Sequence, residues 1–312
     1  MSSPDIALPA APVARRAAPA AGSKVRINPT PPWQKRKRLA TYAGVLPYVA
    51  FAVFPLYLMA VTSFKTTAEI NDFSQSPFWV SGVTLSNYVY LAEKTNYFES
   101  WMLNTIIVSV VTTLISVSVG SLAAYALARL RFRGVEMFGV AVFITYLVPQ
   151  TLLFLPLVDV INWIDQFIPI RDTYWVLIIT YPTFLIPFVT WLLMGYFRTI
   201  PYEVEECAYV DGCGRLRALF RIVMPMAMPG LICAVLFSFT LSWNEFLYSL
   251  VFIQDQFAKT LSVGVFTELI RGDIYYWGSL MAACFAGTIP IVVLYAFFMD
   301  YYTSGLTAGA IK

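Results

Sequence analysis

Three carboxylates lie within seven residues of one polar segment, at Glu205, Glu206 and Asp211. Gly212 follows them, and the segment continues to Pro225. Carboxylates on a short helix offer negative charge and hydrogen-bond acceptors to a complementary surface of another protein. The segment is too polar to cross a membrane, although long apolar runs precede and follow it. We therefore predict that it is a docking surface for a second protein.

A second set of polar residues lies inside an apolar run, at Trp243, Asn244 and Glu245. A charged group inside a bilayer is costly, so Glu245 is expected to face protein or water. Asn244 offers amide donors and an acceptor, and Trp243 offers a flat apolar face of the kind on which sugars stack. These residues are candidates for a pathway that carries a polyhydroxylated solute. The alternative is that Asn244 and Glu245 tie helices together or lie near the outer end of the run.

The absence of several residue types excludes other chemistry. The chain has no histidine, which excludes a Ser-His-Asp relay and a histidine-ligated metal site. Its four cysteines form no CxxC pair, so we expect neither a disulfide nor a zinc site. No P-loop sequence, GxxxxGK followed by Ser or Thr, is present, so the chain is not expected to bind ATP itself. The sequence thus predicts no catalytic residue, no metal and no cofactor on this chain.

The elements that position these residues are predicted to be membrane-spanning helices. Hydrophobic residues make up 59% of the chain and charged residues only 12%, far from the composition of soluble proteins. Backbone groups in lipid need internal hydrogen bonds, and the apolar runs lack the alternation of barrel strands. The predicted fold is an all-α polytopic membrane protein with six transmembrane helices. The six runs long enough to cross about 30 Å of hydrocarbon are residues 39–64, 101–130, 135–158, 174–197, 230–253 and 279–302.

Basic residues are distributed unevenly between the two faces of this topology. Of the 21 Lys and Arg residues, sixteen lie before the first run, after the second, after the fourth or at Lys312, and the other five lie in the remaining loops. Because Lys and Arg near span ends stay on the cytoplasmic side, both termini and the 198–229 loop are predicted to be cytoplasmic. The basic groups are then membrane-flanking anchors, and the net charge of +3 gives no reason to expect nucleic acid as a partner.

The chain is predicted to have three parts. Residues 1–34, rich in Ala, Pro and Ser, are expected to be a disordered cytoplasmic tail. Residues 35–304 form the six-span domain, and residues 305–312 form a cytoplasmic C-terminal tail. Small residues in the second run are expected to permit close helix packing rather than to mark a pore, at Ser116, Ser118, Gly120, Ser121, Ala123 and Ala124.

Two short helices are predicted within the 198–229 loop. The first is expected to begin at Pro201 and to end at Gly212, since glycine readily takes a positive φ. The second is expected over residues 214–224 and is ended by Pro225. Its predicted apolar face consists of Leu216, Leu219, Phe220 and Val223. On helical pattern alone, the loop is either a rigid projection for a partner or an amphipathic segment lying on the membrane surface.

The pattern Glu206-x-Ala208-x-x-Asp211-Gly212, with Ile222-x-Met224-Pro225 ten residues further on, resembles the EAA loop of the membrane subunits of bacterial ABC importers. Cys207 stands where Ala is usual, a small-for-small change that should preserve docking. In that family the helix of this loop sits in a groove of the ATP-hydrolysing subunit and passes its motion to the spans. The resemblance implies ATPase-coupling roles for Glu205, Glu206, Ala208, Asp211, Gly212, Leu216 and Pro225.

The resemblance extends over most of the chain. Prolines at 149, 182 and 187 and the sequence Trp243-Asn244-Glu245-Phe246 look like the maltose-type carbohydrate importers, specifically the second permease of the pair. In that family the high-affinity site can lie entirely in the partner permease, so the resemblance leaves open whether this subunit contacts the substrate. The closing residues are similar to the tail of the second permease, which in the family reaches into the ATPase dimer interface: Gly305, Leu306, Thr307 and Gly309.

One function and two rivals follow from these expectations. The chain resembles a permease of the bacterial inner membrane that moves a di- or oligosaccharide or a related polyol into the cytoplasm by alternating access. The resemblance implies as partners a second permease, two ATPase subunits that hold ATP and Mg, an extracytoplasmic solute-binding protein and membrane lipid. The alternative is a stand-alone secondary transporter or channel, which dependence of uptake on a separate ATPase distinguishes. An intramembrane enzyme lacks a nucleophile and base pair.

Overall fold

The computed structural model describes residues 32–95 and 97–308. The chain divides into two units, Met1–Val53 and Phe54–Lys312, and the boundary falls within helix α1 (Pro32–Ser63). This helix begins at Pro32, so residues 32–34 of the predicted N-terminal tail are helical, and the rest of that tail lies outside the described residues. The second unit is mostly helical and carries both sets of candidate residues.

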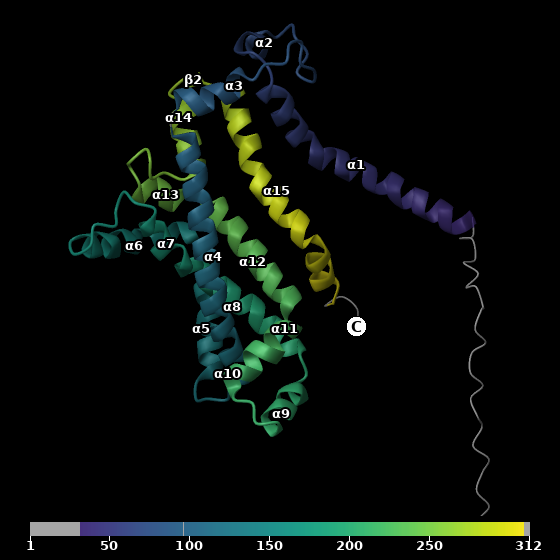
Figure 1. Ribbon diagram of the computed structural model, residues 1–312, viewed down its shortest axis with the longest axis vertical. Helices are drawn as coiled ribbons and strands as arrows, with labels where there is room; N and C mark the ends of the chain where they lie inside the picture. The colour runs from purple at the N-terminus through teal and green to yellow at the C-terminus, as the bar shows by residue number, and fades with distance from the viewer. Residues whose placement is uncertain (1–31, 96, 309–312) are drawn as a thin grey trace, which may run out of the picture. The chain divides into compact units, whose positions relative to one another are not determined.

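Long helices form the body of the second unit (Figure 1): α4 (Phe98–Arg129), α5 (Val135–Leu147), α6 (Gln150–Asp165), α8 (Pro182–Thr199), α12 (Met228–Trp243) and α15 (Trp277–Ala308). The shorter elements are α2 (Thr67–Asn71), α3 (Ser86–Val89), the π-helical turn η1 (Tyr90–Lys94), α7 (Trp175–Thr180), α9 (Tyr202–Val210), α10 (Arg215–Ala218), the π-helical turn η2 (Leu219–Val223), α11 (Met224–Met226), α13 (Leu247–Phe252), α14 (Leu261–Leu269), β1 (Ile270–Arg271) and β2 (Ile274–Tyr275). In the second unit, α9 and α10 lie at one end of α4, and α14 lies at the other.

Among the described residues, four helical stretches are long and apolar enough to cross a membrane, and two bent pairs raise the number to six if each pair is one span. The four are Arg36–Ser63, Phe98–Arg129, Trp175–Thr199 and Trp277–Met299. The bent pairs are Val135–Leu147 with Gln150–Asp165, at 97°, and Arg215–Met226 with Met228–Trp243, at 82°. The apolar helices confirm a helical polytopic protein. The 135–158 run contains the bend between α5 and α6, and the 230–253 run is divided between α12 and α13.

The bend between α5 and α6 has a local cause. Val148 takes an extended conformation with a ψ of 126°, and Pro149 follows with a ψ of 129°. A proline disfavours helical geometry in the residue before it and cannot donate a backbone hydrogen bond. The sequence contains this signal, but an apolar composition alone hides a bend of this size.

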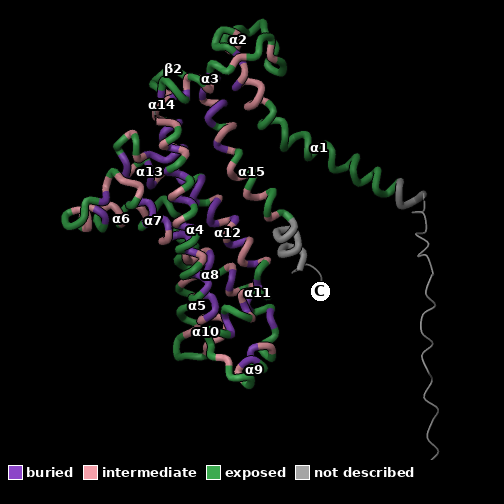
Figure 2. Tube along the Cα trace, viewed as in Figure 1, coloured by how far each residue is buried: buried purple, intermediate pink, exposed green. Residues whose placement is uncertain are grey.

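The core of the second unit lies along α4, α8 and α12, where the buried residues concentrate (Figure 2). Ser116, Gly120 and Ala124 recur every four residues on one buried face of α4. A Cβ at Gly120 would lie 2.6 Å from Cγ1 of Val189 on α8, so only glycine permits this approach. The expected close packing by small residues is confirmed at these positions, whereas Ser118 is exposed.

The start of α4 holds the loop that precedes α14. Nε1 of Trp101 donates to the carbonyl of Gln256 at 2.7 Å, and Nδ2 of Asn104 donates to the carbonyl of Lys259 at 3.1 Å. Gly272, with a φ of 60°, then turns the chain between β1 and β2, in which Ile270 pairs with Tyr275. This end of α4 is therefore tied to residues 256–259.

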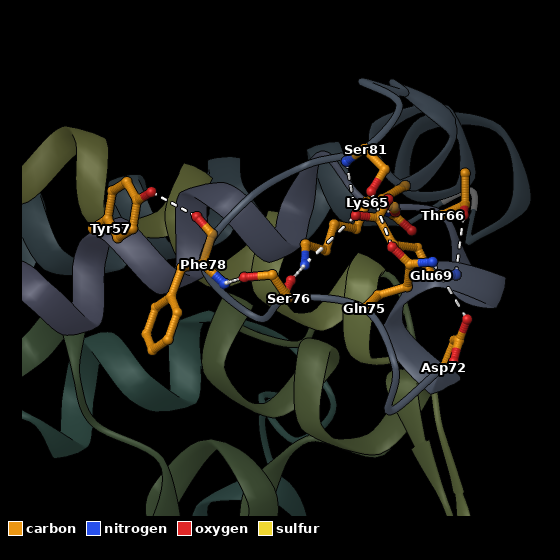
Figure 3. A network of polar contacts seen from close by, with 10 residues as sticks. Tyr57, Lys65, Thr66, Glu69, Asp72, Gln75, Ser76, Phe78 and Ser81 are labelled. Atoms are coloured by element: carbon orange, nitrogen blue, oxygen red, sulfur yellow. Dashed lines mark hydrogen bonds and ion pairs between the residues drawn. The ribbon is translucent and has the colours of Figure 1, made fainter.

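A polar network closes the segment that follows α1 (Figure 3). Nζ of Lys65 donates to the carbonyl of Ser76 at 2.5 Å and lies 3.6 Å from the carboxylate of Glu69. That carboxylate accepts the backbone N–H of Ser81 at 2.9 Å. Both charged side chains are shielded from solvent, with exposed fractions of 5% and 8%. The segment is thus a folded cap rather than an extended linker.

Candidate functional site

The polar segment with the three carboxylates folds as the short helix α9. Pro201 is its N-cap, with a φ of −57° and a ψ of 138°. Glu203 and Glu205 lie in the first turn, where negative charge complements the positive end of the helix dipole. The predicted start at Pro201 is therefore correct to within one residue.

Gly212 ends α9 in the left-handed conformation, with a φ of 81°. Its N–H donates to the carbonyl of Tyr209 at 3.1 Å, and the N–H of Cys213 donates to the carbonyl of Ala208 at 2.9 Å. This pair of bonds is the Schellman motif, which satisfies carbonyls that a helix end leaves free. The prediction that Gly212 stops the helix is confirmed, and the motif fixes the direction in which the chain leaves α9.

The second half of the loop differs from the prediction of one regular helix. Helix α10 passes into the wider turn η2, in which the N–H of Met224 donates to the carbonyl of Leu219, five residues back. Pro225 does not end the segment but lies in the first turn of α11, where its missing N–H leaves no bond unmade. The chain then bends by 82° before Met228. A residue pattern read at 3.6 residues per turn does not detect such a wider turn.

The wider turn also divides the predicted apolar face. Leu219 and Val223 are fully buried in the core against α8 and α12. Leu216 and Phe220 are 65% and 55% exposed, so a single face formed by all four residues is wrong. The buried pair holds the loop to the spans, and the exposed pair is available to a partner.

Glu205 is the anchor of α9. Its side chain is completely buried, and its Oε1 lies 2.7 Å from Nε of Arg129, the last residue of α4. The hydroxyl of Tyr125 donates to Oε2 at 3.0 Å, and the hydroxyl of Tyr209 donates to it at 3.2 Å. Arg129 also donates from Nη2 to the carbonyl of Ile200 at 2.7 Å. One arginine thus joins the end of α4, the end of α8 and the first turn of α9.

The other residues predicted to couple to an ATPase lie mainly on the outside. Glu206, Asp211 and Gly212 are exposed, whereas Ala208 is buried at 5% exposure. Neighbouring residues on a helix point about 100° apart, so Glu205 faces the spans while Glu206 faces solvent. Gly305, Leu306 and Thr307 lie in the last turns of α15, so helix continues into the predicted C-terminal tail, and Gly309 lies outside the described residues.

The second candidate set, Trp243, Asn244 and Glu245, lies where the predicted fifth run is broken. Helix α12 ends at Trp243 and α13 begins at Leu247. Nδ2 of Asn244 donates to the carbonyl of Thr240 at 2.8 Å, so this carbonyl in the last turn of α12 has a hydrogen-bond partner. The break is thus built from the same polar residues that mark the sequence.

The carboxylate of Glu245 accepts hydrogen bonds from backbone N–H groups at the start of α13 and connects this helix to the end of α7. Its Oε1 accepts the N–H of Tyr248 at 2.9 Å, and its Oε2 accepts the N–H of Ser249 at 3.3 Å. The hydroxyl of Tyr181, the residue between α7 and α8, donates to Oε2 at 2.8 Å. Every one of these contacts is to the protein itself, which favours the alternative that Glu245 ties helices together.

Trp243 and Asn244 line a cavity of about 220 Å³ between α12, α14 and α15. The hydroxyl-bearing residues Ser262 and Thr288 line it too, and Glu245 does not. Trp243 is only 5% exposed and stacks on Phe239, with ring centroids 5.4 Å apart. Asn244 is exposed, so among the three candidates it is the one best placed to contact a solute.

The two polar residues at this break are expected to behave differently on substitution. Asn244→Ala should alter transport or solute selectivity while assembly with the partners stays intact. Glu245→Gln should weaken the α12–α13 junction, because each buried hydrogen bond lost there costs about 1–3 kcal/mol. Tyr181→Phe is the matched control, since it removes one bond from the same carboxylate. Unchanged transport of a panel of sugars by Asn244→Ala would assign that residue to structure.

The sequence reading missed three residues that hold these sites together: Tyr125, Arg129 and Tyr181. The sequence does contain an arginine at the end of an apolar run and tyrosines within the apolar runs. No spacing rule, however, links residues that are 80 positions apart in the chain, as Tyr125 and Glu205 are. Within the described part of the chain, no three His, Cys, Asp or Glu residues come together as metal ligands would.

Comparison with known proteins adds a family and relatives. A family model described as "Binding-protein-dependent transport system inner membrane component" matches residues 116–307. The chain is 36% identical over 279 residues to the inner membrane ABC transporter permease protein YcjP of Escherichia coli (strain K12), covering 88% of this chain and 96% of that protein. It is 34% identical over 281 residues to the trehalose/maltose transport system permease protein MalG of Thermococcus litoralis, covering 88% and 97%. Its fold resembles that of a chain from a bacterial ABC transporter involved in the import of the acidic polysaccharide alginate, with a TM-score of 0.68, 22% identity, and coverage of 88% and 99%.

Proposed function

Because the chain belongs to the family of binding-protein-dependent transport system inner membrane components, we propose that it is the second permease of an ATP-binding-cassette importer for a carbohydrate. The family membership confirms the resemblance to a permease subunit of a bacterial ABC importer. The carbohydrate class rests on the relative named as a trehalose/maltose permease, which aligns with 88% of this chain. The solute is a di- or oligosaccharide or a related polyol.

In this proposal the chain alternates access and carries no chemistry of its own. A second permease completes the pore, an extracytoplasmic solute-binding protein delivers the solute, and two ATPase subunits hold ATP and Mg. The α9–Gly212–α10 segment contacts the ATPase through exposed residues that include Glu206 and Leu216. The buried Glu205–Arg129 pair supports this role, because it joins that segment directly to α4.

The test is transport by the complete assembly. The chain is co-expressed with its neighbouring permease, ATPase and binding protein, and the purified complex is placed in vesicles. A carbohydrate bound to the binding protein should stimulate ATP hydrolysis and enter the vesicles only when ATP is present. Uptake that continues with a hydrolysis-deficient ATPase would instead favour a stand-alone carrier.

The proposed orientation places α9 and α10 in the cytoplasm, together with both termini. Helix α4 has 32 residues and spans about 48 Å. One end of it is tied to residues 256–259 and the other to α9. Labels at these two ends should therefore report opposite sides of a membrane.

We expect single cysteines at Thr67 and Asp255 to react with an impermeant thiol reagent outside intact cells, and a cysteine at Arg217 to react only after the membrane is opened. All three positions are exposed, so accessibility on the protein itself does not decide the result. The four native cysteines, at 207, 213, 233 and 284, are replaced first. External labelling at Arg217 would place the loop on the wrong side for an ATPase.

A further inference from the structure

A basic cavity of about 510 Å³ lies where α4 ends and the turn after Gly212 begins. Three arginines line it: Arg129, Arg131 and Arg215. Two tyrosines of α9 also line it, at positions 202 and 209. Of the described residues, none that lines this cavity carries a carboxylate.

The three arginines are not equivalent. Arg129 is neutralised by the buried carboxylate of Glu205, and its guanidinium carbon lies 5.7 Å from the centre of the Tyr202 ring. Arg131 and Arg215 are exposed, and their side chains form no hydrogen bond or ion pair within residues 32–95 and 97–308. The cavity therefore presents two uncompensated guanidinium groups beside a third that is already paired.

The position of the cavity indicates what fills it. Arg129 is the last residue of Phe98–Arg129, a stretch long and apolar enough to cross a membrane, so the cavity lies at one end of that stretch. Basic residues at the ends of membrane spans meet the lipid head groups. Guanidinium groups bind phosphate oxygens through paired N–H donors, and the hydroxyl of Tyr202 supplies a further donor. We propose that this cavity binds the phosphate diester of an anionic phospholipid. The bound phosphate bridges the residues after α4 and the face of α9 that carries Tyr202 and Tyr209.

The experiment measures binding of phosphatidylglycerol to the assembled importer in phosphatidylcholine nanodiscs. The test variant is Arg131→Gln/Arg215→Gln, and the matched control is Arg133→Gln/Arg217→Gln. The control removes the same charge from exposed arginines next to the test positions that do not line the cavity. Phosphatidylglycerol affinity should fall about fivefold for each test arginine removed, as expected for one basic group at an anionic surface, and should be unchanged in the control.

Two further measurements distinguish the phospholipid from other ligands of the cavity. Arg131→Lys/Arg215→Lys keeps the charge and should retain most of the affinity, so a loss confined to the glutamine variant is due to the removed charge. Inorganic phosphate should not displace phosphatidylglycerol, and displacement at comparable affinity would overturn the lipid in favour of a soluble anion. Equal losses in the test and control pairs would overturn the site. Loss of the ATPase with unchanged lipid affinity would assign these arginines to the ATPase contact instead.

Discussion

Gly212→Val is expected to abolish carbohydrate-stimulated ATP hydrolysis while the chain still inserts into the membrane and pairs with the second permease. Gly212 has a φ of 81°, and valine at a positive φ costs about 1–3 kcal/mol because its branched Cβ meets the backbone. A Cβ at this position meets no neighbour within 4 Å, so the effect arises from the turn and not from crowding. Gly212→Asn is the control, since asparagine tolerates this conformation and should retain most of the stimulation. The measurement is ATPase recovery and stimulated hydrolysis in detergent.

Glu206→Lys tests the same segment by charge. Its side chain is exposed beside the turn, and reversing a charge in a contact costs more than removing it. Glu203→Lys is the matched control, because Glu203 is an exposed carboxylate of the same helix that lies outside the EAA pattern. We expect ATPase copurification to be lost with Glu206→Lys and kept with Glu203→Lys. Wild-type uptake by both Gly212→Val and Glu206→Lys would remove the α9–Gly212–α10 segment from the coupling mechanism.

The features that the sequence predicted well are those with local causes. A glycine that ends a helix needs only its own freedom to take a positive φ, and Gly212 does so. Small residues spaced by four permit close packing whichever helix they meet, and Gly120 meets Val189. The apolar runs also predicted the helices of the second unit, because the length and composition of a helix are properties of a single segment.

The features that the sequence did not predict depend on partners far along the chain. The break after Trp243 is stabilised by Glu245, whose carboxylate accepts a hydrogen bond from Tyr181, 64 residues away. The mean hydropathy of residues 230–253 does not reveal the break, because the residues on both sides of it are apolar. The resemblance implies one coupling role for Glu205 and Glu206, but their side chains point in different directions, one to Arg129 and one to solvent.

Arg129→Gln is expected to release α9 from the spans. The substitution leaves the carboxylate of Glu205 buried without its counter-charge, which costs about 3–5 kcal/mol. Hydrogen exchange of the α9 amides measures this local loss, because opening of that helix need not unfold the rest of the chain. Arg133→Gln is the control, since it removes an exposed arginine with no ion pair in the described part of the chain and should change stability by no more than about 0.5 kcal/mol.

The double variant Arg129→Met/Glu205→Leu distinguishes an ion pair from two independent contacts. Replacing both partners with apolar side chains leaves no uncompensated charge, so the double variant should protect the α9 amides better than Arg129→Gln alone. The hydroxyls of Tyr125 and Tyr209 would lose their shared acceptor, so protection should not return fully to the wild-type level. If the double variant is as unprotected as the sum of the two single changes, the pair contributes no coupling between α4 and α9. In that case motion of α9 would have to reach the spans through the buried contacts of Leu219 and Val223.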